Sequence, residues 1–173
     1  KLFLVLSTYP SKEYQIGHAV GLDTISSTYR ILNDLNSNQF DIEKFKNENL
    51  SSALSKSKIK WSLNNYLDSV KKLPQALRKD LFEVWGHPHD DPLAKGSHFE
   101  FNAIKYGNVT VALQPDRALL SDREAEYHNL SKTPCHSYVA FYLWCRSQKT
   151  DALIHLGAHG TLEWLPGKSV ALS

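Results

Sequence analysis

The sequence predicts an α/β fold, in which a mainly parallel sheet is flanked by helices as part of a larger multidomain subunit. Residues 2–7 form a continuous apolar run, which is typical of a strand buried on both faces. A polar loop and a helical pattern follow this run, as at the start of a βαβ unit. A second short apolar run at residues 151–157 predicts another buried strand, which leads into a glycine-containing turn.

The first helix is expected to begin after Asp23, a residue type that caps helix N-termini well. Its apolar positions recur at helical spacing and are Ile25, Tyr29, Leu32 and Leu35. Residues 36–60 are rich in Asn, Ser and Lys and predict a variable surface segment. Residues 61–86 predict two short helices that Pro74 separates. Their expected apolar anchors are Trp61, Tyr66, Val70, Leu77, Leu81 and Trp85.

The second half of the chain continues the alternation of strands and helices. Residues 99–113 predict two strands around a turn at Gly107-Asn108, although Asn-Gly would be the preferred order. Thr133 is a candidate N-cap with Pro134 at the first helical position. The helix that follows is apolar nearly all round and should be buried. Sites in such folds gather at the carboxyl ends of the strands.

Composition excludes several classes of protein. With 173 residues the chain predicts one domain, and 20 basic against 18 acidic side chains give no argument for a nucleic-acid partner. No run approaches the length of a membrane span, and no signal peptide is visible.

Cys135 and Cys145 lie about 15 Å apart along one predicted helix, too far for a disulfide. Reduced thiols indicate a cytoplasmic protein. The chain begins at Lys1 and contains no Met, so we expect a piece of a longer polypeptide.

The stretch HLGAHGTLEWLPGKS, residues 155–169, raises the question of function. Its Gly-Lys-Ser ending is typical of a phosphate-binding loop, but such a loop needs glycine five positions before the glycine of that triplet. Position 162 is Leu, and Glu163 and Pro166 would add a negative charge and remove an N–H from the cradle. The chain also lacks a GxGxxG dinucleotide fingerprint. The sequence therefore argues against a nucleotide loop.

The same stretch does not fit a zinc protease. That motif needs glutamate directly after the first of two helical histidines, whereas Leu156 follows His155 and glycines interrupt the segment. What remains is a strand and a glycine turn that can present His155, His159 and Glu163 toward a cleft. Imidazole and carboxylate groups suit a divalent metal ion and can accept protons. Taken singly, a histidine at a strand end is more often structural, Lys168 more often solvated, and Trp164-Leu165 more often core.

Other histidines are weaker candidates. The segment HPHDD, residues 87–91, could bind a metal, but a surface loop is the favoured interpretation. His128 lies in a loop, where functional residues are common. His18 and His136 have less defined roles.

Taken together, these residues resemble the CobN/magnesium chelatase family. The block HGTLEWLPGK is highly specific to it, and YVAFYLWCRSQKTDALI precedes that block. The resemblance extends to residues 9–23, 73–86 and 107–129. Trp164-Leu165 favours the cobaltochelatase large subunit, CobN, over the magnesium chelatase H subunit, for which Phe-Met is expected. After Gln114-Pro115 the family usually has an Arg-Gly pair and more glycine, whereas this sequence continues with DRALLSDREAE.

The resemblance implies a ligase that forms nitrogen–metal bonds. The expected reaction is ATP-dependent insertion of Co²⁺ into hydrogenobyrinic acid a,c-diamide in aerobic cobalamin biosynthesis. The substrates are the metal ion and a corrin-type tetrapyrrole, and ATP with Mg²⁺ is used by partner subunits of the CobS and CobT type, one of them an AAA+ ATPase. The isolated piece is expected to be inactive, because one domain supplies too little surface to line a cleft that encloses a macrocycle.

The expected site residues combine this resemblance, which implies a catalytic glutamate at Glu163, with the chemistry of the other side chains. Glu163 and His159 are expected to be catalytic, with Glu163 as base or charge stabiliser. His155 and His159 are the candidate metal ligands, and Gly157, Gly160 and His128 are candidates for contact with the macrocycle. Two alternatives remain: a magnesium chelatase H subunit that inserts Mg²⁺ into protoporphyrin IX, and a non-catalytic tetrapyrrole-binding module.

Overall fold

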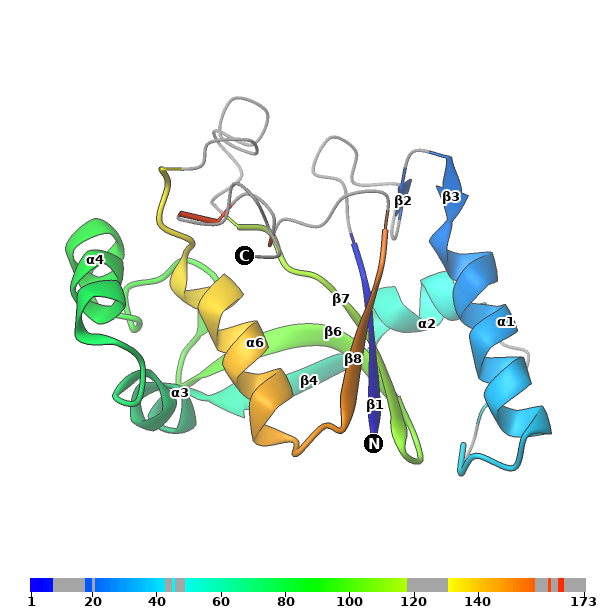
Figure 1. Cartoon of the computed structure of the whole chain (residues 1–173). Helices are drawn as coiled ribbons and strands as arrows, with labels where there is room; N and C mark the ends of the chain where they lie inside the picture. Colours follow the sequence, from blue (N-terminus) through cyan, green and yellow to red (C-terminus); the bar gives the residue numbers. More distant parts are fainter. Residues whose placement is uncertain are drawn as a thin grey trace. The chain divides into compact units, whose positions relative to one another are not determined.

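The computed structural model describes residues 1–7, 18–19, 21–42, 45, 49–117, 131–157, 162 and 165–166 (Figure 1). The chain divides into two compact units. Unit 1 comprises Lys1–Ile59, Phe101–Gln114 and Lys149–Gly160, and unit 2 comprises Lys60–Glu100, Pro115–Gln148 and Thr161–Ser173. The elements in chain order are β1 Leu2–Leu6, β2 His18–Ala19, β3 Leu22–Asp23, α1 Thr24–Ser37, α2 Leu50–Lys56, β4 Lys58–Ser62, α3 Leu63–Val70, α4 Gln75–Trp85, β5 Ala94–Lys95, β6 His98–Tyr106, β7 Val109–Leu113, α6 His136–Ser147 and β8 Ala152–Leu156.

The larger sheet is mixed, and its strand order is β4-β6-β7-β1-β8 with β5 paired to β6. β1 runs parallel to β7 on one side and to β8 on the other. β6 and β7 pair antiparallel, as do β5 and β6. A separate two-stranded ladder joins β2 and β3. The parallel strands on both sides of β1 confirm the predicted α/β class.

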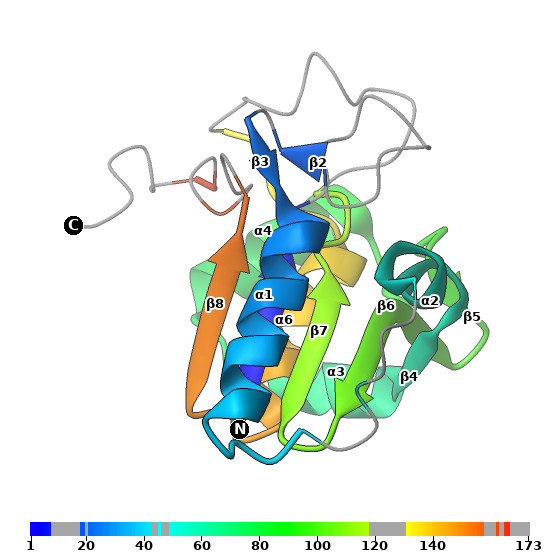
Figure 2. The same cartoon turned by 90° about the vertical axis from the view of Figure 1, so that its right-hand side faces the viewer.

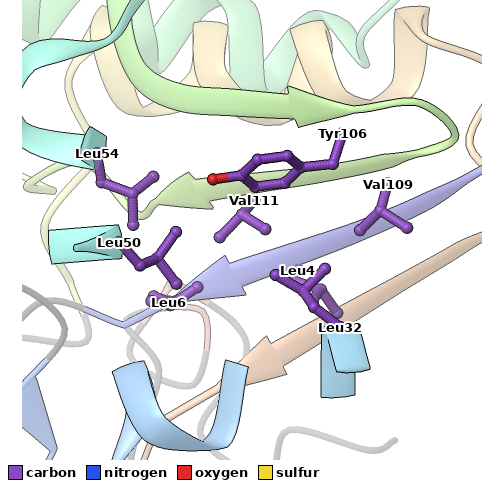
Figure 3. Close-up of a cluster of buried hydrophobic side chains, with 8 residues drawn as sticks. All are labelled: Leu4, Leu6, Leu32, Leu50, Leu54, Tyr106, Val109 and Val111. Atoms are coloured by element: carbon purple, nitrogen blue, oxygen red, sulfur yellow. The ribbon is translucent and has the colours of Figure 1, made fainter. Parts of the chain in front are cut away.

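The core of unit 1 lies between these strands and the two helices α1 and α2 (Figures 2 and 3). Its central side chains are all buried and are Leu4, Leu6, Leu32, Leu50, Leu54, Tyr106, Val109 and Val111. Leu4 and Leu6 come from β1, where even-numbered residues point toward the helices because side chains alternate along a strand. Phe3 and Val5, which alternate with Leu4 and Leu6, are also buried, so β1 is covered on both faces as the continuous apolar run predicted.

Helix α1 begins where the sequence predicted. The Asp23 carboxylate accepts a hydrogen bond of 2.8 Å from the Ser26 N–H, which satisfies one of the free donors of the first turn. The hydrogen bonds from the Ser26 side chain and backbone hold the pKa of Asp23 below its usual value. Farther along the helix, the Tyr29 hydroxyl accepts a 2.8 Å bond from the Leu50 N–H and so connects α1 to the start of α2.

The segment 36–60, expected as a variable surface, contains α2. Asn49 caps this helix by accepting from the Ser52 N–H at 3.0 Å. Leu50 and Leu54 are both fully buried in the core of unit 1. Their neighbours in the sequence are mostly polar, but the two leucines are four positions apart and therefore lie on the same face of the helix. This part of the segment thus contributes to the core.

The turn at Gly107-Asn108 explains the unusual order of its residues. Tyr106 pairs with Val109, so the hairpin loop has two residues. Gly107 has a φ of 56°, whereas Asn108 is not among the residues with positive φ. A positive φ at the first loop position alone is the pattern of a type II′ turn, which requires glycine first. The predicted hairpin is therefore confirmed, with a turn for which Gly-Asn is the fitting order.

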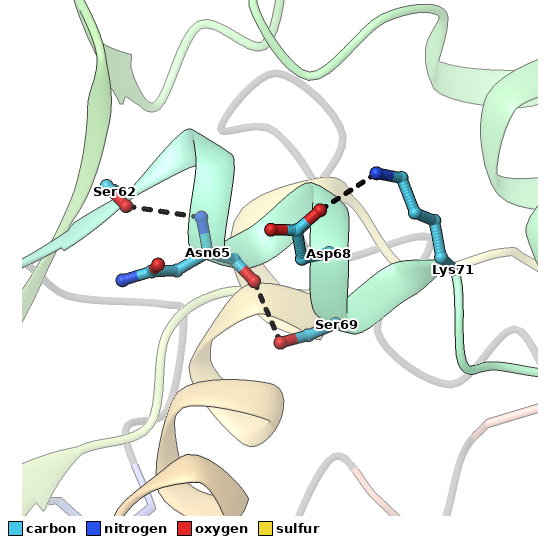
Figure 4. Close-up of polar contacts among 5 residues, drawn as sticks. All are labelled: Ser62, Asn65, Asp68, Ser69 and Lys71. Atoms are coloured by element: carbon cyan, nitrogen blue, oxygen red, sulfur yellow. Dashed lines mark hydrogen bonds and ion pairs between the residues drawn. The ribbon is translucent and has the colours of Figure 1, made fainter.

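Unit 2 contains the two short helices that Pro74 was predicted to separate. Helix α3 is capped by Ser62, whose hydroxyl accepts from the Asn65 N–H at 3.2 Å (Figure 4). Helix α4 begins after Pro74, which ends the preceding turn and gives α4 no side-chain cap. Tyr66 of α3 is fully buried and its ring meets that of Phe99 edge to face, with centroids 5.3 Å apart.

Several detailed expectations were wrong. Helix α6 begins at His136 with Cys135 as N-cap, not after Thr133, because the Cys135 N–H donates to the Arg117 carbonyl at 2.9 Å and holds the preceding residues extended. Trp61 belongs to strand β4 and not to a helix. Leu77, predicted as an anchor, is 37% exposed on α4.

The strand β8 has the predicted position but not the predicted burial. Leu153 and Ile154 are each 40% exposed, although they point to opposite faces of the sheet. Within the described part of the chain β8 is the edge strand, so it lacks the neighbour that would cover it. Among the described residues, no helix is long and apolar enough to cross a membrane.

We expect Leu54→Ala to lower the free energy of unfolding by about 2–5 kcal/mol, because it leaves a cavity in the core of unit 1. Leu77→Ala is the matched control and should change it far less, since Leu77 is exposed. Urea unfolding of both variants measures the difference. Equal effects would mean that α2 does not contribute to the core.

Candidate functional site

The candidate site in unit 1 lies where three strands end side by side. Leu6, the last residue of β1, pairs with Leu113 of β7 and with Leu156 of β8. Pairing continues one residue further, because the Ser7 N–H donates to the Leu156 carbonyl and the Gln114 N–H donates to the Leu6 carbonyl, both at 2.9 Å. The strands are parallel, so all three carboxyl ends lie at the same edge. Such an edge is where ligands bind in open α/β sheets.

Register places three polar side chains on the same face at this edge. Val5 of β1 pairs with His155 of β8, so these two side chains point to the face opposite to α1. Ser7 follows Val5 by two positions, and Gln114 follows Ala112, which also pairs with Val5. Alternation therefore brings Ser7 and Gln114 to the face of His155. A hydroxyl, an amide and an imidazole share this end of the sheet.

The imidazole of His155 is held in its neutral form. Burial lowers its pKa below the usual value, because desolvation disfavours the charged ring. A neutral imidazole is the form that binds a metal ion, since a ring nitrogen must offer a lone pair. His155 can therefore act as a ligand at neutral pH without first losing a proton.

The other site residues predicted from the sequence divide into two groups. Gly157 directly follows β8, and it lies at the strand-end edge beside Ser7. Four predicted site residues lie outside the described residues, and they are His128, His159, Gly160 and Glu163. The structure therefore does not test whether His155, His159 and Glu163 converge, and this stays a prediction.

Ser7 and Gln114 are candidate site residues that the sequence analysis did not single out. Both are only 4% exposed, and each is the first residue after a parallel strand. The Ser7 hydroxyl is buried and has no hydrogen-bond partner among the described residues. No motif marks these two residues. The signal that could have identified them is their position, because each is a polar residue directly after a buried apolar run.

His136 in unit 2 has a structural arrangement. Its Nε2 lies 3.0 Å from the Gly86 carbonyl, which only accepts, so Nε2 carries the proton. Nδ1 therefore accepts from the Tyr66 hydroxyl at 2.7 Å. These bonds join the start of α6 to α3 and to the residue that ends α4. Both ring nitrogens are occupied, so His136 has no lone pair for a metal ion in this arrangement.

The loop HPHDD does not gather a metal site. The rings of His87 and His89 stack with centroids 5.1 Å apart, and both side chains are exposed. Asp91 is buried, and its Oδ1 accepts from the Leu93 N–H at 2.8 Å. Among the described residues, no three His, Cys, Asp or Glu side chains are grouped in a way that could hold a metal ion.

Comparison with known proteins gives a consistent result over the whole chain. Residues 1–173 match the sequence model of the family described as CobN/Magnesium Chelatase. The aerobic cobaltochelatase subunit CobN of Pseudomonas aeruginosa is 33% identical over 189 aligned residues, which cover 100% of the chain and 15% of that relative. The magnesium-chelatase subunit ChlH of Oryza sativa subsp. indica is 25% identical. That alignment again covers 100% of the chain, but only 13% of the ChlH subunit.

A solved structure has the same fold. The catalytic subunit of cobaltochelatase from Mycobacterium tuberculosis superimposes with a TM-score of 0.79 at 28% sequence identity. The match covers 97% of this chain and 16% of that subunit. The chain therefore spans about one sixth of the length of the relatives that it matches.

The buried His136 predicts that stability depends on pH. Burial, the largest cause, lowers the pKa of His136 in the folded state below its usual value of 6.5. The unfolded chain therefore binds the proton more tightly, so stability falls as pH drops through 6.5 toward the lower folded value. We expect the free energy of unfolding to decrease from pH 7.5 to pH 5.5.

The variant His136→Gln should be less stable at neutral pH but should lose less of its stability on acidification. Tyr66→Phe is the control, because it removes one hydrogen bond and keeps the titrating ring. Urea unfolding across this pH range measures both slopes. An unchanged slope in His136→Gln would assign the acid sensitivity to other groups.

Proposed function

The chain belongs to the CobN/magnesium chelatase family, and we propose that its protein is the large, tetrapyrrole-binding subunit of an ATP-dependent cobaltochelatase. The observation that carries this proposal is the 33% identity to a CobN subunit across the full chain, with 25% to a ChlH subunit over the same length. The proposed reaction inserts Co²⁺ into hydrogenobyrinic acid a,c-diamide. Both the metal ion and the macrocycle are substrates.

Metal insertion has two physical requirements. The hydrated ion must exchange water for ring nitrogens, and the ring must release each inner N–H proton that the metal displaces, one from a neutral corrin and two from a porphyrin. A protein can assist the first step by offering an imidazole that replaces a water molecule on the ion. It can assist the second step with a carboxylate that accepts a proton and stabilises the developing positive charge.

We assign these steps to His155 at the strand-end edge and to residues elsewhere in the sequence. His155 is half-buried and neutral, which suits a ligand that receives the ion. We assign His159 as a second ligand or proton relay and Glu163 as the base. Gly157 and Gly160 give the backbone the freedom to approach a flat macrocycle closely, and His128 is proposed as a further contact. Ser7 and Gln114 add hydrogen-bonding groups on the face of His155.

ATP is proposed to act on partner subunits. Position 162 is Leu, so the segment that ends in Gly-Lys-Ser lacks the glycine that a phosphate loop needs. Hydrolysis is therefore assigned to an AAA+ subunit and its companion, of the CobS and CobT type. This division leaves metal and macrocycle chemistry to the large subunit.

Two alternatives have distinct outcomes. A magnesium chelatase H subunit would insert Mg²⁺ into protoporphyrin IX, and comparing both metals with both macrocycles in the reconstituted complex separates the branches. A non-catalytic module would bind the macrocycle, seen as a shift of its absorbance spectrum, but would support no metal insertion with either ion.

We expect Glu163→Gln in the full-length subunit to abolish cobalt insertion while macrocycle affinity stays within about two-fold. The amide keeps the shape of the side chain but cannot accept the proton. Insertion is followed by the absorbance of the metallated product, and affinity by titration. Glu83→Gln is the matched control, because Glu83 is an exposed residue on α4. Normal turnover by Glu163→Gln would remove this residue from the mechanism.

We expect His159→Ala to raise the Co²⁺ concentration needed for half-maximal rate by ten-fold or more, because a lost ligand weakens capture of the ion. Binding of the macrocycle should change little. Measuring the rate against Co²⁺ concentration at saturating macrocycle tests this. An unchanged cobalt dependence would return His159 to a structural role.

A further inference from the structure

Unit 2 contains a pocket of about 450 Å³ between α3 and α4. Its lining residues are Leu67, Val70, Lys71, Gln75, Arg78, Lys79 and Phe82. The volume is within the range of pockets that hold small organic ligands, which are typically apolar with a few placed polar groups. Leu67, Val70 and Phe82 provide the apolar part, and the charged groups in the lining are all cations.

Two of the three cations already have acidic partners. Lys71 Nζ lies 2.8 Å from Asp68 Oδ1, and Figure 4 shows this side chain turned toward Asp68. Lys79 Nζ lies 3.7 Å from Glu83 Oε1, one helical turn away. Both pairs are exposed, and their charges are largely balanced. These lysines therefore leave little uncompensated charge in the pocket.

Arg78 differs from both lysines. Among the described residues it has no ion pair, and its Nε is buried without a hydrogen-bond partner. A buried donor that remains unpaired costs free energy, whereas a carboxylate would satisfy it. The planar guanidinium matches a carboxylate in a two-point hydrogen-bonded pair. The pocket therefore presents one unsatisfied positive group beside an apolar lining.

The start of α4 adds to the positive potential. Gln75, the first residue of α4, lines the same pocket. Pro74 makes no side-chain capping bond, and the first turn contains no acidic residue. The partial positive charge of this helix end is therefore not offset by a capping carboxylate.

We propose that this pocket binds a small organic carboxylate with an apolar chain or ring, anchored by Arg78. The carboxylate pairs with the guanidinium, and the apolar body contacts Leu67, Val70 and Phe82. One uncompensated cation favours a monoanion over a phosphate or a polyacid. The site requires residues of unit 2 alone and does not depend on the chelatase assignment.

The test uses octanoate as the probe and octanamide as its neutral analogue of equal length. Each is titrated calorimetrically into the full-length protein at neutral pH. We expect saturable octanoate binding, with octanamide weaker by about ten-fold or more, the ratio that one charged hydrogen-bonded pair supplies. Absence of octanoate binding at millimolar concentration would overturn the proposal, as would equal affinity for the amide.

Variants of Arg78 locate the binding. Arg78→Gln should weaken octanoate binding by about ten-fold or more and leave octanamide binding unchanged, whereas Arg78→Lys should lie between the two because it keeps the charge without the planar fork. Arg30→Gln is the matched control, since Arg30 is an exposed arginine on α1. Far-ultraviolet circular dichroism confirms that each variant is folded. Wild-type octanoate affinity in folded Arg78→Gln would refute the assignment.

Discussion

The parallel pairing of β1 with both β7 and β8 is the constraint on which the candidate site depends. β1 is buried along Phe3 to Leu6, so its register is fixed by apolar contacts on both faces. A slip of β1 by one residue would turn both Val5 and Ser7 toward α1, so that Ser7 would no longer share a face with His155. The hydrogen bonds beyond the last paired residues extend this order to the strand ends. The segments that follow the three strands in the sequence therefore start from one edge.

The sequence predicted those elements whose structure is decided by neighbouring residues. The apolar run of β1, the capping carboxylate of Asp23 and the break at Pro74 each act within a few positions of the chain. Their effects survive in the folded protein because packing agrees with them. The hairpin at Gly107 belongs to this group too, since a two-residue loop with glycine first specifies its own turn type.

Elements that depend on distant residues could not be predicted in the same way. The start of α6 is set by a bond from Cys135 to Arg117, which lies eighteen positions earlier and carries no local signal. Exposure of Leu153 on β8 follows from the position of that strand at a sheet edge, which an apolar run does not reveal. Ser7 and Gln114 join His155 only through register. Single polar residues of this kind have no pattern of their own.

The fully buried His136 and the half-buried His155 illustrate how position decides chemistry. Burial lowers the pKa of His136 and that of His155, so both rings are neutral at pH 7. The ring of His136 donates a hydrogen bond from Nε2 to the Gly86 carbonyl and accepts one at Nδ1 from the Tyr66 hydroxyl. It therefore serves to join helices. His155 lies instead near a strand end, on a face with a hydroxyl and an amide and two residues before Gly157. A neutral imidazole is not by itself a metal ligand, because the ring must also lie where an ion can reach one of its nitrogens.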